Sequence, residues 1–282
     1  MNQITIEEKT DTADEPDYAA IKVKQRGAWS SGDYALIGST LNIVGEQLAE
    51  AANINPDERV LDVAAGNGNA TLAAGRRFAK VTSTDYVETL LEKGRIRAKA
   101  EGMQIDFQQA DVEALPFADD TYDVVVSTFG CMFAPNQVQT AAEMARVCRP
   151  GGRIAMANWT PDSFIGELFK VIGKHVPPPA GVQSPALWGT RARLEEIFGQ
   201  AASRIEIKTQ AFNFRYRNVA HWLDLFRTYY GPTHKAFAAL QPDAQDQLAA
   251  EMVDLAQRHN VAGDGGMVVP SAYAEVVITK RG

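Results

Sequence analysis

The stretch Val60–Ala70, with sequence VLDVAAGNGNA, constrains the fold more than any other part of this 282-residue chain. An apolar run interrupted only by Asp62 leads into small residues around Gly66 and Gly68, and helix-favouring residues continue from Thr71. This order predicts a buried parallel strand, a tight loop and the start of a helix. Glycines there can adopt positive φ and let a ligand approach bare backbone, and free N–H groups at a helix start favour a carboxylate or a phosphate.

Two common glycine-rich loops do not match this stretch. The dinucleotide fingerprint requires a third glycine three residues after the second, and Thr71 occupies that position. The phosphate-binding Walker loop requires Gly-Lys followed by Ser or Thr, and the loop contains no lysine. The pattern that remains is D-x-A-x-G-x-G over Asp62–Gly68.

Strand and helix patterns alternate on both sides of this loop. Predicted strands cover residues 60–63, 81–84, 105–108, 122–127, 153–158, 205–208 and 272–279, and predicted helices cover 87–100, 136–148, 161–172 and 191–198. Such alternation predicts an α/β fold, a Rossmann-like seven-stranded, mostly parallel sheet with helices on both faces. A ligand of such a sheet binds at the carboxyl ends of the strands, beside strand one.

The segments flanking this core have different characters. Residues 1–17 are acidic and without periodicity, so we expect a flexible N-terminus. Residues 18–55 are expected to form a helical cover, with Ile37, Leu41 and Val44 on one helix face. Residues from about 213 to 263 are expected to form a helical lid inserted before the last strand. We therefore predict a single domain over residues 18–282.

Polar residues follow the predicted strands at the expected ligand edge. Asp85 ends the second strand, and an ionised aspartate can accept hydrogen bonds from both hydroxyls of a ribose. The run D-V-E-A-L-P-F at Asp111–Phe117 follows the third strand, Ser127-Thr128-Phe129 end the fourth, and R-P-G-G at Arg149–Gly152 precedes the fifth.

Three of these pieces occur in order and at suitable spacing: the D-x-A-x-G-x-G loop, the D-x-E-x-L-P-F run and the R-P-G-G turn. Over residues 34–160 the chain thereby resembles the class I S-adenosylmethionine (SAM)-dependent methyltransferases. It is most similar to the small-molecule subgroup that includes the ubiquinone and menaquinone C-methyltransferases. The resemblance weakens after residue 160, where the acceptor-binding parts of that superfamily vary.

The resemblance implies a set of cofactor-binding residues. The loop would frame the methionine part of SAM, Asp85 would hold the ribose, Tyr86 would lie against the adenine face, and Asp111 with Val112 would hold the adenine edge. Asn67 replaces the Thr or Ser often found in the loop. The full predicted set is Asp62, Ala64, Gly66, Asn67, Gly68, Asp85, Tyr86, Asp111, Val112, Ser127 and Phe129. S-adenosylhomocysteine (SAH) would be the product of the cofactor.

Purely structural roles stay open for several of these residues. Gly66 and Gly68 can simply shape a tight turn, and Asp85 can cap the helix that follows it. Asp111 can be a turn residue before Pro116.

Composition excludes several other classes of protein. The formal charge is −7, but six acids and one lysine lie within residues 1–20, so the rest is nearly neutral. A nucleic-acid binder needs a basic stripe, and we find none. The two cysteines, Cys131 and Cys148, support neither a disulfide framework nor a zinc site, so we predict no metal. Without a signal pattern or an 18-residue apolar run, the chain is expected to be cytoplasmic.

Methyl transfer from a sulfonium is an in-line displacement that depends mainly on alignment and needs a base only when the acceptor must lose a proton. The weak candidates for that role are His221, Tyr229 and Tyr230. Trp29, Phe129, Trp159 and Trp188 suggest an aromatic pocket for an apolar or aromatic acceptor. The predicted function is methyl transfer to such a small metabolite, by a monomer or a dimer. The alternatives are a SAM-binding protein without transfer and a dinucleotide-dependent oxidoreductase.

Overall fold

The computed structural model describes residues 16–263 and 265–282, so the acidic segment predicted to be flexible lies outside the described residues except for Pro16 and Asp17. Within the described residues, one sheet contains β1 (Arg59–Val63), β2 (Lys80–Asp85), β3 (Asp106–Gln109), β4 (Tyr122–Thr128), β5 (Cys148–Trp159), β6 (Ala202–Tyr216) and β7 (Met267–Lys280). The α-helices are α1 (Tyr18–Trp29), α2 (Tyr34–Gly38), α3 (Asn42–Ala51), α4 (Asn69–Gly75), α5 (Glu88–Ala100), α6 (Gln137–Val147), α7 (Phe164–His175), α8 (Arg191–Phe198), α9 (Val219–Tyr229), α10 (Gly231–Ala239) and α11 (Pro242–His259). Short 3₁₀ helices cover Ser39–Leu41, Cys131–Phe133 and Pro185–Gly189.

The strand order is β3-β2-β1-β4-β5-β7-β6. The first five strands are parallel to one another, and β7 runs antiparallel to both of its neighbours. The order reverses beside β1, because the chain passes from β1 to β2 and β3 on one side and then crosses from β3 to β4 on the other side. The predicted Rossmann-like, mostly parallel seven-stranded fold is confirmed, and a ligand site is expected beside β1.

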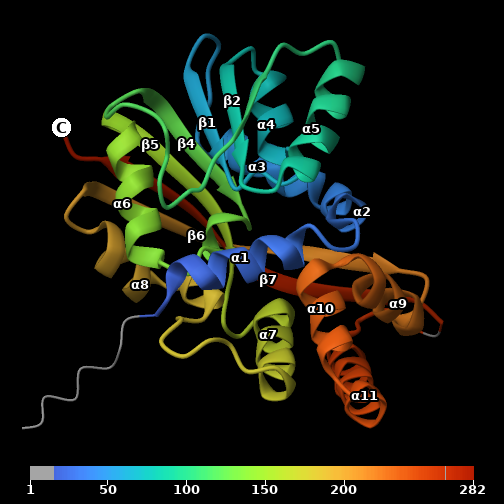
Figure 1. Cartoon of the computed structure of the whole chain (residues 1–282). Coiled ribbons are helices and arrows are strands. Elements are labelled where there is room, and N and C mark those ends of the chain that lie inside the picture. The colour runs from blue at the N-terminus through green and yellow to red at the C-terminus, as the bar shows by residue number, and fades with distance from the viewer. Residues whose placement is uncertain (1–15, 264) are drawn as a thin grey trace, which may run out of the picture.

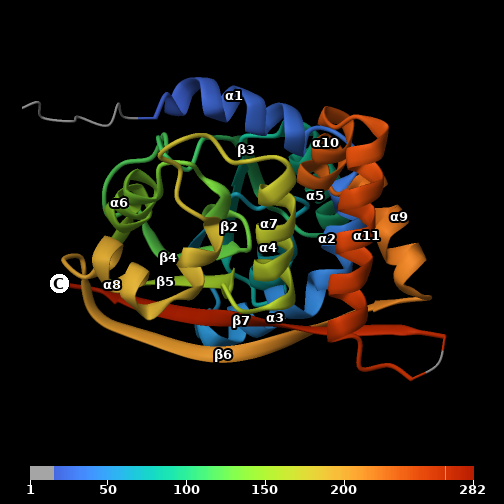
Figure 2. The same cartoon turned by 90° about the horizontal axis from the view of Figure 1, so that it is seen from below.

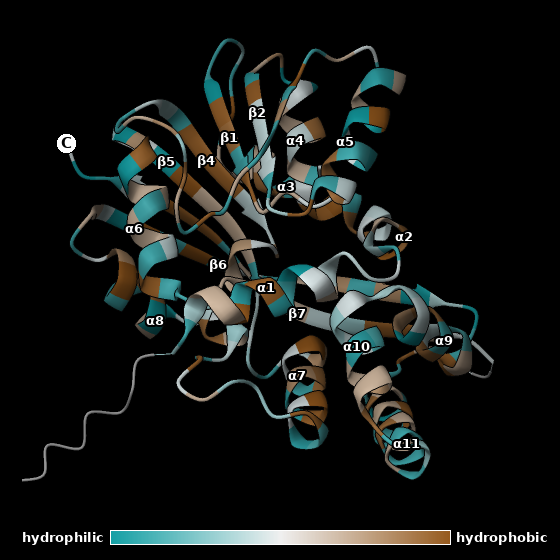
Figure 3. Cartoon of the chain, in the orientation of Figure 1, coloured by the Kyte–Doolittle hydropathy of each residue, from teal (hydrophilic) through white to brown (hydrophobic). Residues whose placement is uncertain are grey.

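The core has two parts because β4 is covered on both faces. Val124 and Val126 point to one face and pack in a cluster with residues of α3 and α4, including Leu48 and Ala73. Val125 points to the other face and belongs to the larger cluster. Figure 3 shows hydrophobic residues along β4 and β5 and mixed polarity on the surrounding helices. This continuous apolar run is typical of a parallel strand buried on both sides.

The helices α1, α7, α10 and α11 gather beyond the carboxyl ends of the parallel strands. Figure 1 shows α1 crossing in front of these ends, with α7, α10 and α11 beyond it, and Figure 2 shows α1 on the opposite side of the molecule from β6. The helix α10 packs against both α1 and α7. Among the described residues, no helix is both long and apolar enough to span a membrane.

Several predicted strand boundaries are wrong, including the start of the last strand, which begins at Met267 rather than at residue 272. Residues 213–216 continue β6, so the inserted helices begin at Val219 rather than at residue 213. The strand is longer because β6 pairs with β7 as far as Tyr216. This pairing includes Phe212 and Phe214, whose side chains are buried. The predicted fifth strand also starts too late, because β5 begins at Cys148 and passes through the R-P-G-G turn with a register shift against β4.

Candidate active site

The loop between β1 and α4 passes through left-handed backbone at three positions. Ala64 has φ 48°, Gly66 has φ 58° and Gly68, the N-cap of α4, has φ 84°. A hydrogen bond of 2.9 Å from the Ala65 N–H to the Thr84 carbonyl ties this loop to β2. Left-handed backbone costs an alanine roughly 1–2 kcal/mol, and such strain persists where the surrounding structure enforces it.

A second strained residue faces the loop from the end of β4. Phe129 has φ 58°, is buried, and stacks on Trp159 with ring centroids 3.8 Å apart. The next residue, Gly130, lies so close to Ala64 that a Cβ would collide with the Ala64 carbonyl oxygen. The ends of β1 and β4 are therefore held together, and their strained residues border the switch point of the sheet.

Two adjoining hollows open at this point. The first, which we call the loop hollow, has a volume of about 520 Å³ and is lined by Trp29, Tyr34, Ala64, Ala65, Gly66, Asn69, Asp85, Leu90, Thr128, Phe129, Gly130 and Phe133. The second, the α1 hollow, has a volume of about 300 Å³ and is lined by Lys22, Gln25, Ala64, Tyr86, Ala110, Asp111, Val112, Ala134 and Pro135. Ala64 lines both.

Asp85 stands at the centre of the loop hollow and holds its walls. One carboxylate oxygen accepts from the Val87 N–H at 2.8 Å, and the other accepts from the Gly66 N–H at 2.9 Å. Asp85 therefore shapes both the glycine loop and the approach to α5. Each oxygen keeps a further lone pair for a ligand hydroxyl. Burial raises the pKa of Asp85 to about 6, although its backbone hydrogen bonds act in the opposite direction.

Four of the predicted cofactor residues lie behind the hollows rather than in their lining. Asp62 is 1% exposed, and its Oδ2 accepts from both the N–H and the hydroxyl of Thr71. Its other oxygen is buried without a hydrogen-bond partner, and burial raises the pKa of this carboxyl to about 7. The Ser127 hydroxyl donates to the Val63 carbonyl. Asn67 and Gly68 complete the set of supporting residues.

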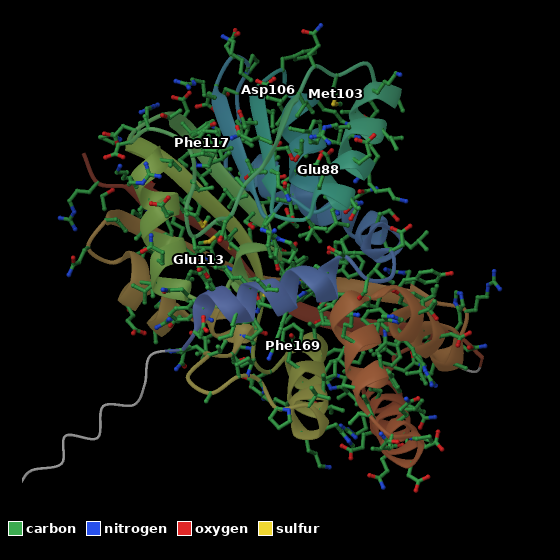
Figure 4. The ribbon with its side chains drawn as sticks, viewed as in Figure 1. Glu88, Met103, Asp106, Glu113, Phe117 and Phe169 are labelled. Atoms are coloured by element: carbon green, nitrogen blue, oxygen red, sulfur yellow. The ribbon has the colours of Figure 1, made fainter. Side chains whose placement is uncertain are left out.

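The helix α1 closes the α1 hollow with an ion-paired lysine. Lys22 Nζ lies 2.6 Å from Asp111 Oδ2 and 3.0 Å from Glu113 Oε2. Figure 4 shows Glu113 close to α1. The other oxygen of Asp111 accepts from the Glu113 N–H. Asp111 therefore lines the hollow, and α1 is attached to it through Lys22.

A third hollow, which we call the aromatic chamber, adjoins the loop hollow. It has a volume of about 330 Å³ and is lined by Trp29, Tyr34, Ile37, Leu41, Phe129, Phe133, Trp159, Ile165, Phe214, Phe226 and Tyr230. Trp29 is a centre of its packing, with ring centroids 5.5 Å from Tyr34 and 5.6 Å from Tyr230. The chamber and the loop hollow share Trp29, Tyr34, Phe129 and Phe133.

The three weak catalytic candidates differ in whether they line these hollows. Tyr230 lines the aromatic chamber, whereas His221 and Tyr229 lie outside the residues that line these hollows. His221 instead accepts a hydrogen bond through Nδ1 from the Arg217 N–H. Trp188 belongs to the core beside Phe198 and not to the chamber.

Sequence reasoning missed the contributions of Lys22 and Tyr34. Both come from the N-terminal helices and reach residues far away along the chain. The Tyr34 ring lies against the glycine loop, where a Cβ on Gly66 would sit 3.4 Å from it. An available signal was the pair of aromatic residues, Trp29 and Tyr34, on either side of the Ser-Ser-Gly-Asp turn.

Comparison with known proteins agrees with this geometry. A family model described as a methyltransferase domain matches residues 60–152, which include β1 through the start of β5. An uncharacterised protein of Mycobacterium tuberculosis is 37% identical over 239 residues, covering 83% of this chain and 87% of its own length. The demethylmenaquinone methyltransferase of Deinococcus radiodurans is 34% identical over 137 residues, 47% of this chain and 56% of its own.

The fold is also found among solved structures. A structure described as a putative methyltransferase from Bacillus halodurans superposes with a TM-score of 0.56 at 21% identity, covering 83% of this chain and 96% of its own. With the Gly-x-Gly loop, Asp85 and the hollows beside β1, these findings establish that the chain belongs to the class I SAM-dependent methyltransferases. Its cofactor is SAM.

The raised pKa of Asp85 predicts how cofactor binding depends on pH. We expect Asp85 to accept from the ribose hydroxyls. Because the ionised carboxylate is the better acceptor, SAM binding should favour ionised Asp85. Affinity is therefore expected to fall as the pH falls through the cofactor-free pKa of about 6. We expect constant affinity above about pH 7 and a loss approaching tenfold per unit below about pH 6, measured by titration calorimetry. Asp85→Asn is the control, and it should flatten the profile. An equally steep profile in that variant would assign the dependence to another group.

Proposed function

We propose that the protein transfers the methyl group of SAM to a small acceptor with an apolar or aromatic body. The observation that carries the proposal is the aromatic chamber, which opens into the loop hollow beside Asp85. An acceptor there and a sulfonium in the loop hollow would be neighbours. The enclosing rings would exclude water and favour a cation near their faces.

In this proposal the cofactor lies along both hollows. The ribose hydroxyls donate to Asp85, and the adenine fits between Tyr86, Val112 and Asp111 in the α1 hollow. The methionine part lies along the loop near Thr128, whose buried hydroxyl has no hydrogen-bond partner and lines the loop hollow. Asp62, Asn67, Gly68 and Ser127 act by holding the loop in place. An unpartnered buried hydroxyl supports this placement because such groups are costly without a partner.

The chamber would act through alignment. Holding the acceptor atom in line with methyl and sulfur can contribute roughly 7–11 kcal/mol of the barrier reduction in favourable cases. Two tyrosines line the chamber, and burial raises the pKa of both Tyr34 and Tyr230 far above neutrality. We infer that these hydroxyls stay protonated and orient the acceptor by donating or accepting hydrogen bonds. Proton removal would then depend on the ionisation of the acceptor itself.

The organisation of the chain is part of the same proposal. Residues 18–55 and the inserted helices, observed from Val219 to His259, would cover the site of a single domain. The acceptor would be a cytoplasmic metabolite rather than a nucleic acid, because the body of the chain is nearly neutral. Both a monomer and a dimer are compatible with it.

Titration calorimetry followed by a turnover assay tests the proposal. We expect micromolar binding of SAM, SAH bound at least as well, and no binding of NADH. Incubation with SAM and a panel of small aromatic and apolar nucleophiles should then give SAH and a product heavier by one methylene. SAM binding without any methylated product would favour a SAM-binding protein that does not transfer methyl.

A further inference from the structure

The most spacious hollow described lies outside the aromatic chamber. We call it the outer groove. It spans about 1400 Å³, open to solvent, between α1, α7, the segment 176–185 and α10. Of its 19 lining residues, only Gln25, Lys170, Gln183 and Ser184 are polar. A cleft with a mostly apolar lining and a few polar groups is typical of a small-molecule site.

The outer groove is continuous with the proposed reaction site. Trp29 and Phe133 line the groove, the aromatic chamber and the loop hollow, and Tyr230 lines the groove and the chamber. The ring centroids of Trp29 and Phe133 lie 5.0 Å apart. Phe133 also contacts Phe169 in the middle of α7, with centroids 5.6 Å apart, and Figure 4 shows Phe169 close to α1. We call Trp29, Phe133 and Tyr230 the aromatic gate.

We propose that the acceptor carries a linear apolar chain, which lies in the outer groove while the reacting head passes the aromatic gate. This inference rests on the proposed function, because it uses the same reaction site. The groove spans about 1400 Å³, far more than the chamber, so an extended apolar part of the acceptor has room only in the groove.

The chemistry of the lining favours an alkyl or isoprenoid-like chain over a peptide. Phe169, Ile172, Val176 and Val182 offer aliphatic and aromatic surface, and Pro178, Pro179 and Pro185 have no backbone N–H to donate to a peptide. The N-terminal residues 1–15 are poorly suited as occupants, because the segment contains Glu7, Glu8, Asp11, Asp14 and Glu15. Burying such carboxylates against apolar side chains is costly.

A homologous series of 4-n-alkylphenols, from methyl to nonyl, tests the inference by binding. Each phenol is titrated into the full chain saturated with SAH, and the quenching of tryptophan fluorescence gives the dissociation constant. Each methylene buried in the groove should tighten binding by about threefold, until the chain extends beyond the groove. Affinity independent of chain length would overturn the proposal.

A pair of matched variants locates the chain. Val182→Asp introduces a carboxylate into the groove on a surface segment, and it should abolish the chain-length dependence while SAH binding stays unchanged. Val138→Asp makes the same substitution at a 58% exposed position on α6, away from the groove lining, and should behave like the unmodified protein. Retained dependence in Val182→Asp would overturn the proposal, because the chain would then bind elsewhere.

Other occupants and the proposed function are tested separately. If affinity depended on chain length only after deletion of residues 1–15, the groove would be assigned to that segment and the proposal would be overturned. The groove would be assigned to a second copy if the unmodified protein were a dimer without chain-length dependence and Val182→Asp dissociated it. That result would also overturn the proposal. Chain-length dependence without methyl transfer would support the groove and contradict the proposed function. Methyl transfer to short phenols alone would support the proposed function and contradict the role of the groove.

Discussion

Replacing Asp85 with alanine is expected to weaken SAM binding by about 100-fold or more. Hydrogen bonds to a charged group contribute about 1.5–3 kcal/mol each, and about 1.4 kcal/mol corresponds to a factor of ten. Two ribose hydroxyls would lose their acceptor. The Gly66 and Val87 N–H groups also lose theirs, so the melting temperature should fall by a few degrees.

Asp123→Ala is the matched control for this experiment. Asp123 also accepts from a backbone N–H, that of Arg59, and pairs with Arg149, but it lies near the amino end of β4, away from the hollows. This variant should lose a similar amount of stability and keep its SAM affinity. Calorimetry and thermal denaturation measure the two effects. Unchanged SAM affinity in Asp85→Ala would contradict the proposed placement of the ribose.

Gly130→Ala is expected to disrupt the site through the backbone. Its new methyl group would collide with the Ala64 carbonyl, which belongs to backbone and cannot rotate away. Overpacking of this kind costs about 1–3 kcal/mol. Ala64 lines both the loop hollow and the α1 hollow, and displacements of about 1 Å can cost roughly 100-fold in activity. We therefore expect SAM affinity and turnover to fall together.

The control for this substitution is Gly27→Ala on α1. A Cβ at Gly27 meets no atom within 4 Å, so the same chemical change falls in open space. Replacing a helical glycine by alanine should raise stability by about 0.5–1 kcal/mol. If both Gly130→Ala and Gly27→Ala kept the SAM affinity of the unmodified protein, the close approach of β4 to Ala64 would not be needed for the site.

The elements that the sequence predicts well are those specified by local patterns. The helix α8 begins and ends as predicted, because the Thr190 hydroxyl accepts from the Arg193 N–H and Gly199 follows the last helical turn. The strand β1 and its loop were likewise predictable from one apolar run and two glycines. The presence of Asp85 in the site was predictable because this residue ends a strand.

Features that depend on distant pairing were harder to predict. The full length of β6 depends on its pairing with β7, although the alternation of Phe212 and Phe214 with polar residues was a local signal of a strand. In the site, Lys22 reaches Asp111 across 89 residues of sequence, and no local pattern indicates such a contact. Tyr34 was missed for the same reason, since its ring meets the loop after β1 only in the folded chain.

The position of α1 has a kinetic consequence. This 12-residue helix carries Lys22 and Gln25 over the α1 hollow and ends at Trp29 in the aromatic gate. We expect the adenosine end of the cofactor to lie beneath this helix, so an opening of α1 that released it would also displace the Trp29 ring. Exchange of spent cofactor and exchange of acceptor would then share one opening event. The opening rate of α1 would then set an upper limit on the turnover rate, whether cofactor or acceptor is being released.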